Sequence, residues 1–361
     1  MSCNRKTKEI LNCALVVTIV LFVSIKDARA DFVFGEPENL GPAVNSPDLE
    51  GFFDISSDGL ELYFGSDRPG GQGDDIWVTK RENVIDPWEL SFNPGTPVNG
   101  PYSEGAPCIT PDGLSLYFGS NRPGGLGNWD IYVTKRATIE DPWEEPVNLG
   151  ASVNSASDES SPSISADGLS LYFQSSRPGG LGGIDIYVTT RELISDPWVP
   201  AVNLGSTVNN TGIDLCPRIS NDGLLLYFSR FPSGMAYPPE LWLTRRRSIS
   251  DFWSSPVNIG LAAASPKFSA DESIIFFSSH GYGGYGGPDF FQVSIEPVVD
   301  LNSDGIVDCA DMCIMVDNWG TDEPLCDIGP TPFGDGIVDV EDLIVLAEHL
   351  FEEFPQVEPV E

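Results

Sequence analysis

Short runs of β-branched and aromatic residues recur along most of the chain, separated by Gly, Pro, Asn and Asp. In the first complete unit these runs occupy residues 51–55, 60–65 and 75–80, and a further run lies near residues 95–98. Runs of this length and composition, bounded by turn-forming residues, are typical of β-strands. Each unit is therefore predicted to form one small four-stranded sheet.

The unit recurs at a nearly constant spacing. Three copies share an Asp-Gly turn, a Leu-Tyr-Phe strand, an Arg-Pro-Gly-Gly loop and a strand that begins Asp-Ile, and two decayed copies follow. The aspartates that mark successive turns are 54, 55, 55 and 49 residues apart, at Asp58, Asp112, Asp167, Asp222 and Asp271. A repeat of this period predicts a solenoid or a propeller, and a four-stranded unit is a propeller blade.

The N-terminal segment is predicted to close the ring. A phrase of the type Val-Asn-Leu-Gly ends three units, at residues 146–150, 201–205 and 256–260, and a related phrase stands before the first unit at residues 37–41. The last unit has none, so the N-terminal phrase supplies its outer strand and hides two sheet edges. The predicted fold is mainly β, with a five-bladed propeller over residues 31–296. Six blades are the alternative, if the segment before Phe52 forms a degenerate blade.

Residues 1–30 have the pattern of a secretory signal peptide. A basic start precedes an apolar stretch over residues 13–25, and residues 28–30 read Ala-Arg-Ala. The apolar stretch is short for a membrane-spanning helix, so we expect a secreted protein (extracellular, cell-surface or periplasmic) without membrane insertion. Cleavage would remove five basic and two acidic residues and shift the formal net charge from −35 to −38. Such a charge repels nucleic acid and favours divalent cations or basic partners.

Five cysteines follow residue 30. Cys108 and Cys216 lie within the repeats, whereas Cys309, Cys313 and Cys326 lie near the C-terminus. Export permits disulfides, so a bridge from Cys326 to Cys309 or Cys313 is one option, and the odd count leaves at least one thiol over. Structural roles are favoured over a metal site, since no histidine stands near these cysteines.

The polar residues that recur in every copy are interpreted as structural. An Asp-Gly pair is the natural turn between two strands. Each loop arginine precedes an aspartate by seven or eight residues, which predicts salt bridges that pin the glycine loop to its blade: Arg68 to Asp75, Arg122 to Asp130 and Arg177 to Asp185. A residue copied into every blade does not make a catalytic centre, so no catalytic residue is assigned.

Function is therefore sought where the copies differ. Residues 230–239 and 280–287 replace the glycine loop with aromatic-rich sequences, which suit a surface that binds a sugar or a protein. An enzyme in the propeller funnel is the alternative, because glycosidases use two carboxylates. Candidates are Asp74, Asp158 and Glu159. Two unrepeated carboxylates facing each other across the opening would favour an enzyme, and a lining of repeat-equivalent residues would favour binding.

Residues 300–311 match a 12-residue calcium loop. Oxygen-bearing side chains stand at positions 1, 3, 5, 9 and 12, glycine stands at position 6, and position 7 offers its carbonyl. An apolar helical stretch follows at residues 312–319, and a second half-match leads into a helix at residues 343–350. The predicted Ca²⁺ ligands are Asp300, Asn302, Asp304, Ile306, Asp308 and Asp311 in the first loop, and Asp335, Ile337, Asp339 and Asp342 in the second.

Two family resemblances follow from these motifs. The motifs D-G-x-x-L-Y-F, S-x-R-P-G-G-x-G and D-I-Y-V-T over about residues 32–296 resemble the WD40-like PD40 repeats of the TolB family, which implies a propeller. The paired loops over about residues 298–352, each ending in Asp and opening a helix, resemble a type I dockerin. That resemblance implies calcium binding and a cohesin-like partner, contacted through loop positions 10 and 11. In this chain these positions are Cys309, Ala310, Val340 and Glu341.

The second loop departs from the dockerin pattern. Thr331 and Phe333 occupy positions 1 and 3, where Asp or Asn is expected. Either this site is weak, or Asp327 and loop carbonyls complete it by a longer path. Residues 297–361, including an acidic tail, are thus expected to act as an attachment module or only as a calcium-stabilised cap.

Together the sequence predicts an exported, non-catalytic recognition or assembly protein. The propeller would bind a glycan or a protein, and the C-terminal module would attach it to a secreted or cell-surface complex. The dockerin resemblance implies a link to polysaccharide utilisation. A glycoside hydrolase or lyase with its site in the propeller funnel is the alternative.

Overall fold

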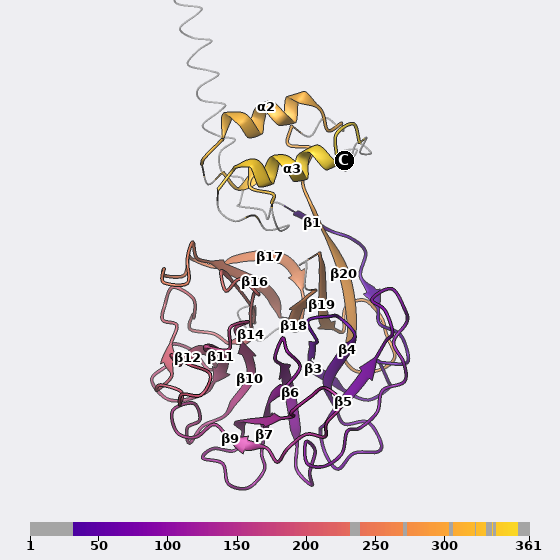
Figure 1. Ribbon diagram of the computed structural model, residues 1–361, viewed down its shortest axis with the longest axis vertical. Coiled ribbons are helices and arrows are strands. Elements are labelled where there is room, and N and C mark those ends of the chain that lie inside the picture. The colour runs from indigo at the N-terminus through magenta and orange to yellow at the C-terminus, as the bar shows by residue number, and fades with distance from the viewer. Residues whose placement is uncertain are drawn as a thin grey trace, which may run out of the picture. The chain divides into compact units, whose positions relative to one another are not determined.

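The computed structural model describes residues 32–231, 239–269, 273–302, 306–321, 323–329, 334 and 337–352. Strands account for most of the ordered elements, and they are arranged around a common centre (Figure 1). The predicted signal peptide, residues 1–30, lies outside the described residues. In the described part of the chain, no helix is long and apolar enough to cross a membrane.

The strands of the described residues form five antiparallel sheets, one for each repeat. Blades one and two contain β3 (Glu50–Ile55), β4 (Glu61–Ser66) and β5 (Asp75–Lys80), then β6 (Glu104–Ile109), β7 (Ser115–Ser120), β8 (Asp130–Lys135) and β9 (Val147–Asn148). Blades three and four contain β10 (Glu159–Ile164), β11 (Ser170–Ser175), β12 (Asp185–Thr190) and β13 (Val202–Asn203), then β14 (Asp214–Ile219), β15 (Leu225–Arg230), β16 (Glu240–Arg245) and β17 (Val257–Ala262). Blade five contains β18 (Ala264–Phe268), β19 (Ile274–Ser279) and β20 (Asp289–Pro297).

The N-terminal segment closes the ring, as predicted. β1 (Phe32–Phe34) and β2 (Glu38–Asn39) both pair antiparallel with β20, the outermost strand that the last repeat itself supplies. The innermost strands contact one another in the order β3, β6, β10, β14 and β18, and β18 contacts β3 again. The five-bladed prediction is thus confirmed for the described residues. The ring leaves no place in it for a sixth blade.

Blade one differs from the prediction at its outer edge. A fourth strand was expected near residues 95–98, but this sheet has three strands, and its outer edge is a single bridge between Val78 and Phe92. In blade two, Leu149 donates its backbone N–H to the Ile131 carbonyl at 3.1 Å. Pro94 stands at the equivalent position of blade one and has no N–H to donate, so the strand does not extend.

The repeated aspartates form the predicted turns. In the first copy, the Asp58 carboxylate accepts a hydrogen bond from the Leu60 backbone N–H at 3.0 Å, and Gly59 has a φ of +71°. A positive φ favours glycine, because other residues meet a steric penalty there. The same Asp-Gly geometry returns in the next three copies. Asp271 lies outside the described residues.

The predicted partner of the loop arginines is wrong. Arg68 pairs with Glu50 at 2.7 Å, at the start of the innermost strand of the blade, and not with Asp75. The corresponding pairs are Arg122 with Glu104 at 3.0 Å, Arg177 with Glu159 at 3.1 Å, and Arg230 with Asp214 at 2.5 Å. The aspartates at the predicted positions do hold the glycine loops, but they do so by accepting backbone N–H bonds, as Asp130 does from Leu126 at 2.5 Å.

The C-terminal residues form two short helices around a core of their own. α2 (Cys309–Asp317) and α3 (Val340–Glu348) are joined through η1 (Pro324–Cys326), and the core includes Val307, Met315 and Leu346. Each helix begins with a capping box, in which the N-cap aspartate and the aspartate three residues later satisfy backbone N–H groups.

No disulfide forms among the five cysteines of the described residues. Cys309 and Cys313 lie on the exposed side of α2, one turn apart, whereas Cys326 is buried in the core beneath it. The optional bridge from Cys326 is therefore absent, because its side chain and those of its expected partners face opposite sides of the helix.

Candidate functional site in the propeller centre

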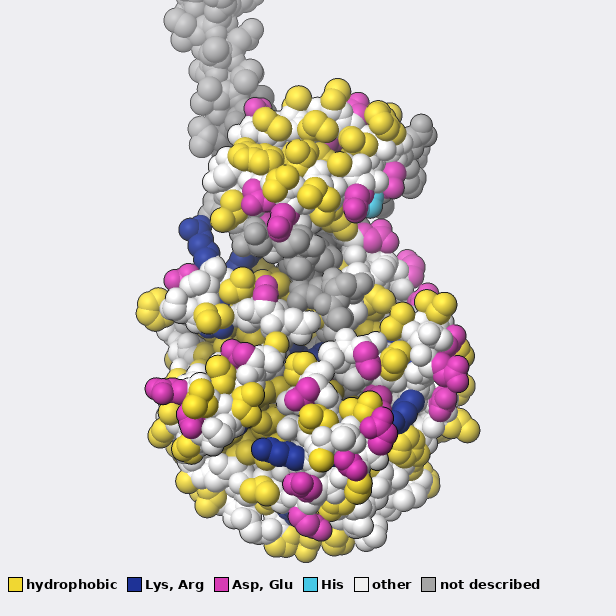
Figure 2. Space-filling model, viewed as in Figure 1, with side chains coloured by type: hydrophobic (Ala, Val, Ile, Leu, Met, Phe, Trp, Pro, Cys, Tyr) yellow, Lys and Arg dark blue, Asp and Glu magenta, His cyan; other side chains and the backbone are white. Residues whose placement is uncertain are grey.

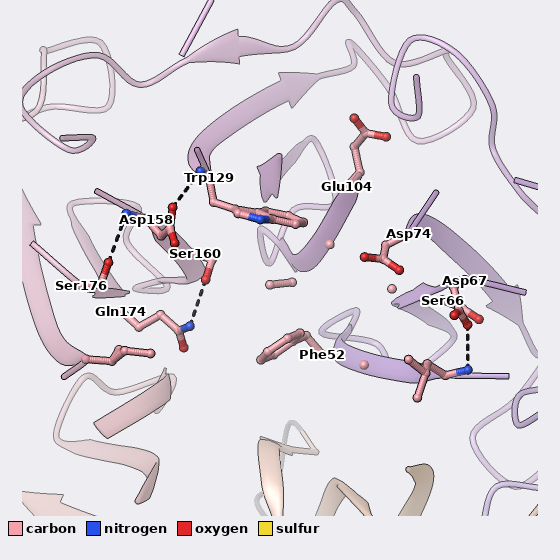
Figure 3. A pocket seen from close by; sticks show the side chains of 16 residues that line it. Phe52, Ser66, Asp67, Asp74, Glu104, Trp129, Asp158, Ser160, Gln174 and Ser176 are labelled. Atoms are coloured by element: carbon pink, nitrogen blue, oxygen red, sulfur yellow. Dashed lines mark hydrogen bonds between the residues drawn. The ribbon is translucent and has the colours of Figure 1, made fainter. Parts of the chain in front are cut away.

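A cavity of about 380 Å³ opens at the end of the propeller where the innermost strands begin (Figure 3). Blades one, two and three supply most of its walls. Its lining includes the aromatic rings of Phe52 and Trp129, the aliphatic side chains of Leu49 and Ile184, and the polar groups of Asp67, Asp74, Glu104, Asp158 and Gln174. A volume of this size is in the range of small-molecule sites.

One backbone position supplies a different side chain to the cavity from each of three blades. The carbonyl oxygens of Asp74, Trp129 and Ile184 each accept a hydrogen bond from the first residue of the innermost strand in the next blade, at 2.6, 2.9 and 2.9 Å. The backbone at this position is thus the same in each blade, whereas the side chain is a carboxylate in Asp74, an indole in Trp129 and an aliphatic group in Ile184. These three residues directly precede the third strand of each unit, so the difference between the repeats was visible in the sequence.

Phe52 reaches the cavity from a bulge in β3. The pairing of β3 with β4 shifts register between Gly51 and Phe53, and Phe52 adopts a φ of +31° with 37% of its surface exposed. A bulge re-aims the side chain that it contains. The same bulge recurs in the other four blades with smaller residues: Ala106, Ser161, Cys216 and Ser265. Phe52 is thus the aromatic member of a set that sequence reasoning did not single out.

Two of the three predicted carboxylates line the cavity. Asp74 comes from blade one and Asp158 from blade three, and Figure 3 shows them on opposite sides of the opening. Asp158 accepts a hydrogen bond from the Trp129 backbone N–H at 3.3 Å. Neither carboxylate recurs at its equivalent position in the neighbouring blades. Glu159, the third candidate, is buried and forms the structural ion pair with Arg177.

The cavity is acidic. Partial burial raises the pKa of Asp74, and the neighbouring carboxylates of Asp67 and Asp75 raise it further. Asp67 accepts a hydrogen bond from the Leu49 backbone N–H at 2.8 Å. None of the residues that line the cavity, all of which lie in the described ranges, is Lys, Arg or His. Anionic ligands are therefore disfavoured here, and uncharged or cationic ligands are favoured.

The predicted aromatic surfaces of blades four and five are only partly described. Residues 232–238 of the blade-four segment lie outside the described residues. In blade five, Tyr282 and Tyr285 are 43% and 48% exposed. Tyr282 packs edge-on against Phe277 and Phe291 at centroid distances of 5.8 and 5.6 Å, so one of its faces supports the blade. Neither tyrosine lines the central cavity.

The predicted calcium loops lie at the starts of the two C-terminal helices. Asp311 is fully buried, and its carboxylate accepts backbone N–H bonds from Asn302 at 3.0 Å and Asp308 at 2.8 Å. Asp304 and Asp335 lie outside the described residues. Within the described ranges, no three His, Cys, Asp or Glu side chains are grouped as metal ligands. The described members of the predicted set are Asp300, Asn302, Ile306 and Asp308 beside Asp311, and Ile337, Asp339 and Asp342.

The two helical units repeat each other's bonding. Val307, before α2, exchanges backbone hydrogen bonds with residues 351 and 352 beyond α3. Val338, before α3, does the same with residues 320 and 321 beyond α2. The bonds therefore cross between the units in a reciprocal way, as in an internal duplication.

The second loop closes over a longer path than the first. Asp342 accepts from the backbone N–H groups of Ile328 and Gly329 at 2.6 and 2.8 Å, where Asp311 accepts from Asn302. Asp327 is buried, and its carboxylate lies so close to Gly334 that a side chain there would meet it. Asp327 thus faces into the second loop.

The predicted partner-binding residues are all at the surface. Cys309 and Ala310 at the start of α2, and Val340 and Glu341 at the start of α3, are exposed. The next helical turns expose Val316 and Ile344 at 53% and 54%. Figure 2 shows hydrophobic side chains gathered on the visible face of these helices.

Comparisons with known proteins return propellers at low similarity. TolB from Acinetobacter baumannii is 16% identical, with a TM-score of 0.42, over 70% of this chain and 56% of that chain. A putative TolB from Agrobacterium tumefaciens is 18% identical, with a TM-score of 0.44, over 73% and 86%. The catalytic domain of a GH62 α-L-arabinofuranosidase from Coprinopsis cinerea is 12% identical, with a TM-score of 0.49, over 74% and 97%. No family model and no curated protein matches the sequence.

Proposed function

We propose that this chain is an exported recognition and assembly protein. Its propeller binds an uncharged, hydroxyl-rich ligand such as a glycan in the central cavity. Its C-terminal residues 297–361 form a calcium-dependent, dockerin-like module that attaches the propeller to a cohesin-like partner. The observation that carries the proposal is the cavity, whose walls differ from blade to blade although the backbone repeats.

The cavity walls suit a glycan ligand. The rings of Phe52 and Trp129 offer apolar faces, and the carboxylates of Asp74 and Asp158 offer hydrogen-bond acceptors on opposite sides. Ligand sites in proteins combine apolar and aromatic surface with a few placed polar groups of this kind. An acidic cavity without a lining cation also selects against uronic acids and phosphorylated sugars.

Titration of the full chain with neutral oligosaccharides tests the ligand proposal. Trp129→Ala removes the largest ring and is expected to weaken binding at least tenfold. Trp198→Ala is not a suitable control, because Trp198 belongs to the core. Tyr102→Ala is suitable, since Tyr102 is 39% exposed and does not line the cavity. Equal affinities for the wild type and Trp129→Ala would place the ligand elsewhere.

Glycoside hydrolysis is the second candidate, and the placement of Asp74 and Asp158 favours it. The two carboxylates are unrepeated and lie across the opening, as the reaction requires of an acid and a partner carboxylate. The raised pKa of Asp74 suits a general acid. Release of reducing ends by the wild type, lost in both Asp74→Asn and Asp158→Asn while binding persists, would identify a hydrolase. Binding without turnover would identify a recognition site.

The C-terminal proposal rests on the reciprocal bonding of the two helical units and on their donor set. Carboxylates, a side-chain amide and backbone carbonyls are the oxygen ligands that Ca²⁺ prefers, so the residues fit this ion. When bound, Ca²⁺ would neutralise the loop carboxylates and hold each loop against its helix. The exposed residues at the helix starts would then be presented to the partner.

A pull-down from the native secreted fraction, with calcium and with chelator, tests attachment. Partners retained only with calcium would support the module, and an empty pull-down with a calcium-loaded protein would favour the stabilising-cap alternative. Titration calorimetry tests the metal site itself. Asp304→Ala is expected to lower Ca²⁺ affinity sharply, and unchanged Ca²⁺ binding would disprove the first-loop assignment.

A further inference from the structure

The five innermost strands surround the propeller axis, and we call the space that they enclose the channel. A second set of unrepeated residues meets in the channel at the end away from the acidic cavity. One position of each innermost strand faces a tyrosine or phenylalanine of the second strand, and it holds a different residue in every blade. Because the five strands surround one axis, these side chains converge. They are Asp54, Cys108, Ser163, Arg218 and Lys267.

Arg218 crosses the channel from blade four. Its guanidinium donates to the Phe53 carbonyl of blade one and to the Pro162 carbonyl of blade three, both at 2.9 Å, and to the Pro217 carbonyl at 3.3 Å. The residue is 3% exposed, and its Nε has no hydrogen-bond partner within the described part of the chain. Within the described ranges, the positive charge of Arg218 thus meets carbonyl dipoles and forms no ion pair with a carboxylate.

Lys267 of blade five forms an ion pair with the nearby carboxylate of Asp54. Its Nζ pairs with Asp54 at 2.9 Å, and the other Asp54 oxygen accepts the Ile109 backbone N–H at 2.8 Å. Burial, and then the Asp54 carboxylate, raise the pKa of the Cys108 thiol to about 12, so this thiol is neutral at physiological pH. Among the described residues, two cations therefore share one anion. A buried charge of this kind is costly unless a counter-charge compensates it.

A recess of about 50 Å³ opens beside these two cations. Arg218 and Lys267 line it together with Ser56, Ser57 and Ser220, and this basic recess lies at the end of the innermost strands away from the acidic cavity. Lys267 is 27% exposed, and an ammonium group has three N–H donors, of which Asp54 takes one. The volume exceeds that of a single water site and suits one compact anion.

We propose that the basic recess binds a compact oxyanion, either a tetrahedral ion such as phosphate or sulfate or the carboxylate of a small organic acid. Lys267 donates hydrogen bonds to it, and Arg218 supplies the uncompensated charge. Asp54 competes with the anion for Lys267. The two ends of the channel then have opposite preferences, because the acidic cavity repels the ions that the basic recess attracts.

Thermal melting and titration calorimetry of the full chain test this inference with sodium phosphate, sulfate and acetate, each against chloride at equal ionic strength. Lys267→Met is expected to weaken anion binding at least tenfold. Asp54→Asn is expected to strengthen it severalfold, because the lysine loses its internal partner. Lys135→Met is the matched control, since Lys135 is exposed at the end of β8 and should leave binding unchanged.

The variants make the outcome decisive. A ligand that binds the native state raises the melting temperature further as its concentration exceeds its dissociation constant, with a logarithmic dependence on concentration. General salt stabilisation raises the melting temperature equally in all four proteins. An equal response of the wild type and Lys267→Met would overturn the proposal, as would the absence of any response in the wild type. A response to phosphate and sulfate alone would identify a tetrahedral ligand, and a response to acetate a carboxylate. If Asp54→Asn does not fold, Lys267→Met and Lys135→Met still decide.

Discussion

Single residues carry the difference between a structural repeat and a site in this propeller. The backbone carbonyls of Asp74, Trp129 and Ile184 make the same inter-blade hydrogen bond, yet their side chains share no chemistry. The converse holds for the buried ion pairs, in which Arg68, Arg122 and Arg177 repeat both position and partner. Repetition thus marks residues that hold the blades, and departure from it marks residues that face the channel.

At this scale, Arg122→Met is expected to lower the free energy of unfolding by about 3 kcal/mol at neutral pH, because it leaves the buried Glu104 carboxylate without its cation. Urea unfolding measures the change. Lys80→Met is the control, since Lys80 itself is exposed and Arg136 still lies 3.7 Å from Glu61 when the lysine is removed. An ion pair with an exposed lysine is worth less than about 1 kcal/mol. Similar losses in the two variants would contradict a special role for the buried pair.

The same pairs predict how stability depends on pH. Burial raises the pKa of Glu50, Glu104 and Asp214 in the folded state above the ordinary values of 4.5 and 3.8. The folded state therefore binds protons more readily than the unfolded state. The stability that these three carboxyl groups contribute is complete at a pH below their ordinary pKa values, and it is lost as pH rises through their raised pKa values. Burial alone would also raise the pKa of Glu61, but its hydrogen bonds to Lys80 and Tyr63 and the nearby cations outweigh burial and lower this pKa. The contribution of Glu61 to stability therefore depends on pH in the opposite direction.

Mild acidification from neutral pH is accordingly expected to raise the melting temperature. Glu104→Gln should flatten that rise, because the variant lacks one of the three titrating groups. A melting temperature that falls steadily from pH 7 to pH 5 would show that carboxyl groups with a lowered pKa, such as Glu61, outweigh the three groups with a raised pKa.

At the scale of elements, the short closing strands β1 and β2 are expected to contribute strongly to the stability of the whole ring. Deletion of residues 31–44 removes β1 and β2 and exposes the edge of β20, and we expect the loss of a single cooperative melting transition. Glu38→Ala is the control. It removes one exposed side chain, which accepts from Gln292 at 3.0 Å, and it keeps the backbone pairing. An unaltered cooperative melt of the truncated protein would rule out closure by this strand.

The elements also show what the sequence could and could not predict. Strand order, blade number and ring closure followed from the repeat, because each copy carries its own turn and strand signals. The partner of Arg68 was missed, because Glu50 lies 18 residues before it and the repeat offered a nearer aspartate. Trp129 and Phe52 were missed as site residues for a different reason. Their positions in the cavity depend on an inter-blade bond and a bulge, neither of which has a local sequence signature.

At the scale of the whole molecule, the formal net charge of −35 predicts a response to salt. Ions of about 0.15 M screen exposed charges beyond roughly 8 Å, whereas the buried pairs of each blade are screened much less. Raising NaCl from low to physiological concentration is therefore expected to raise the melting temperature through weaker self-repulsion. Differential scanning calorimetry checks this. A melting temperature that falls with added NaCl would show that exposed ion pairs outweigh the repulsion.

The pairing of β2 with β20 also fixes the order of events in biosynthesis. Asn39 donates to Asp289 across 250 positions of chain, so β1 and β2, which are synthesised first, must wait for nearly all of the propeller before they find their partner. Blades one to four can assemble from neighbouring hairpins, but contacts this distant in sequence form late and slowly. Until then β2 and β20 both offer an unpaired edge. The ring is therefore most exposed to aggregation and proteolysis in the interval before its last step, and any factor that guards the nascent chain would be needed at its beginning.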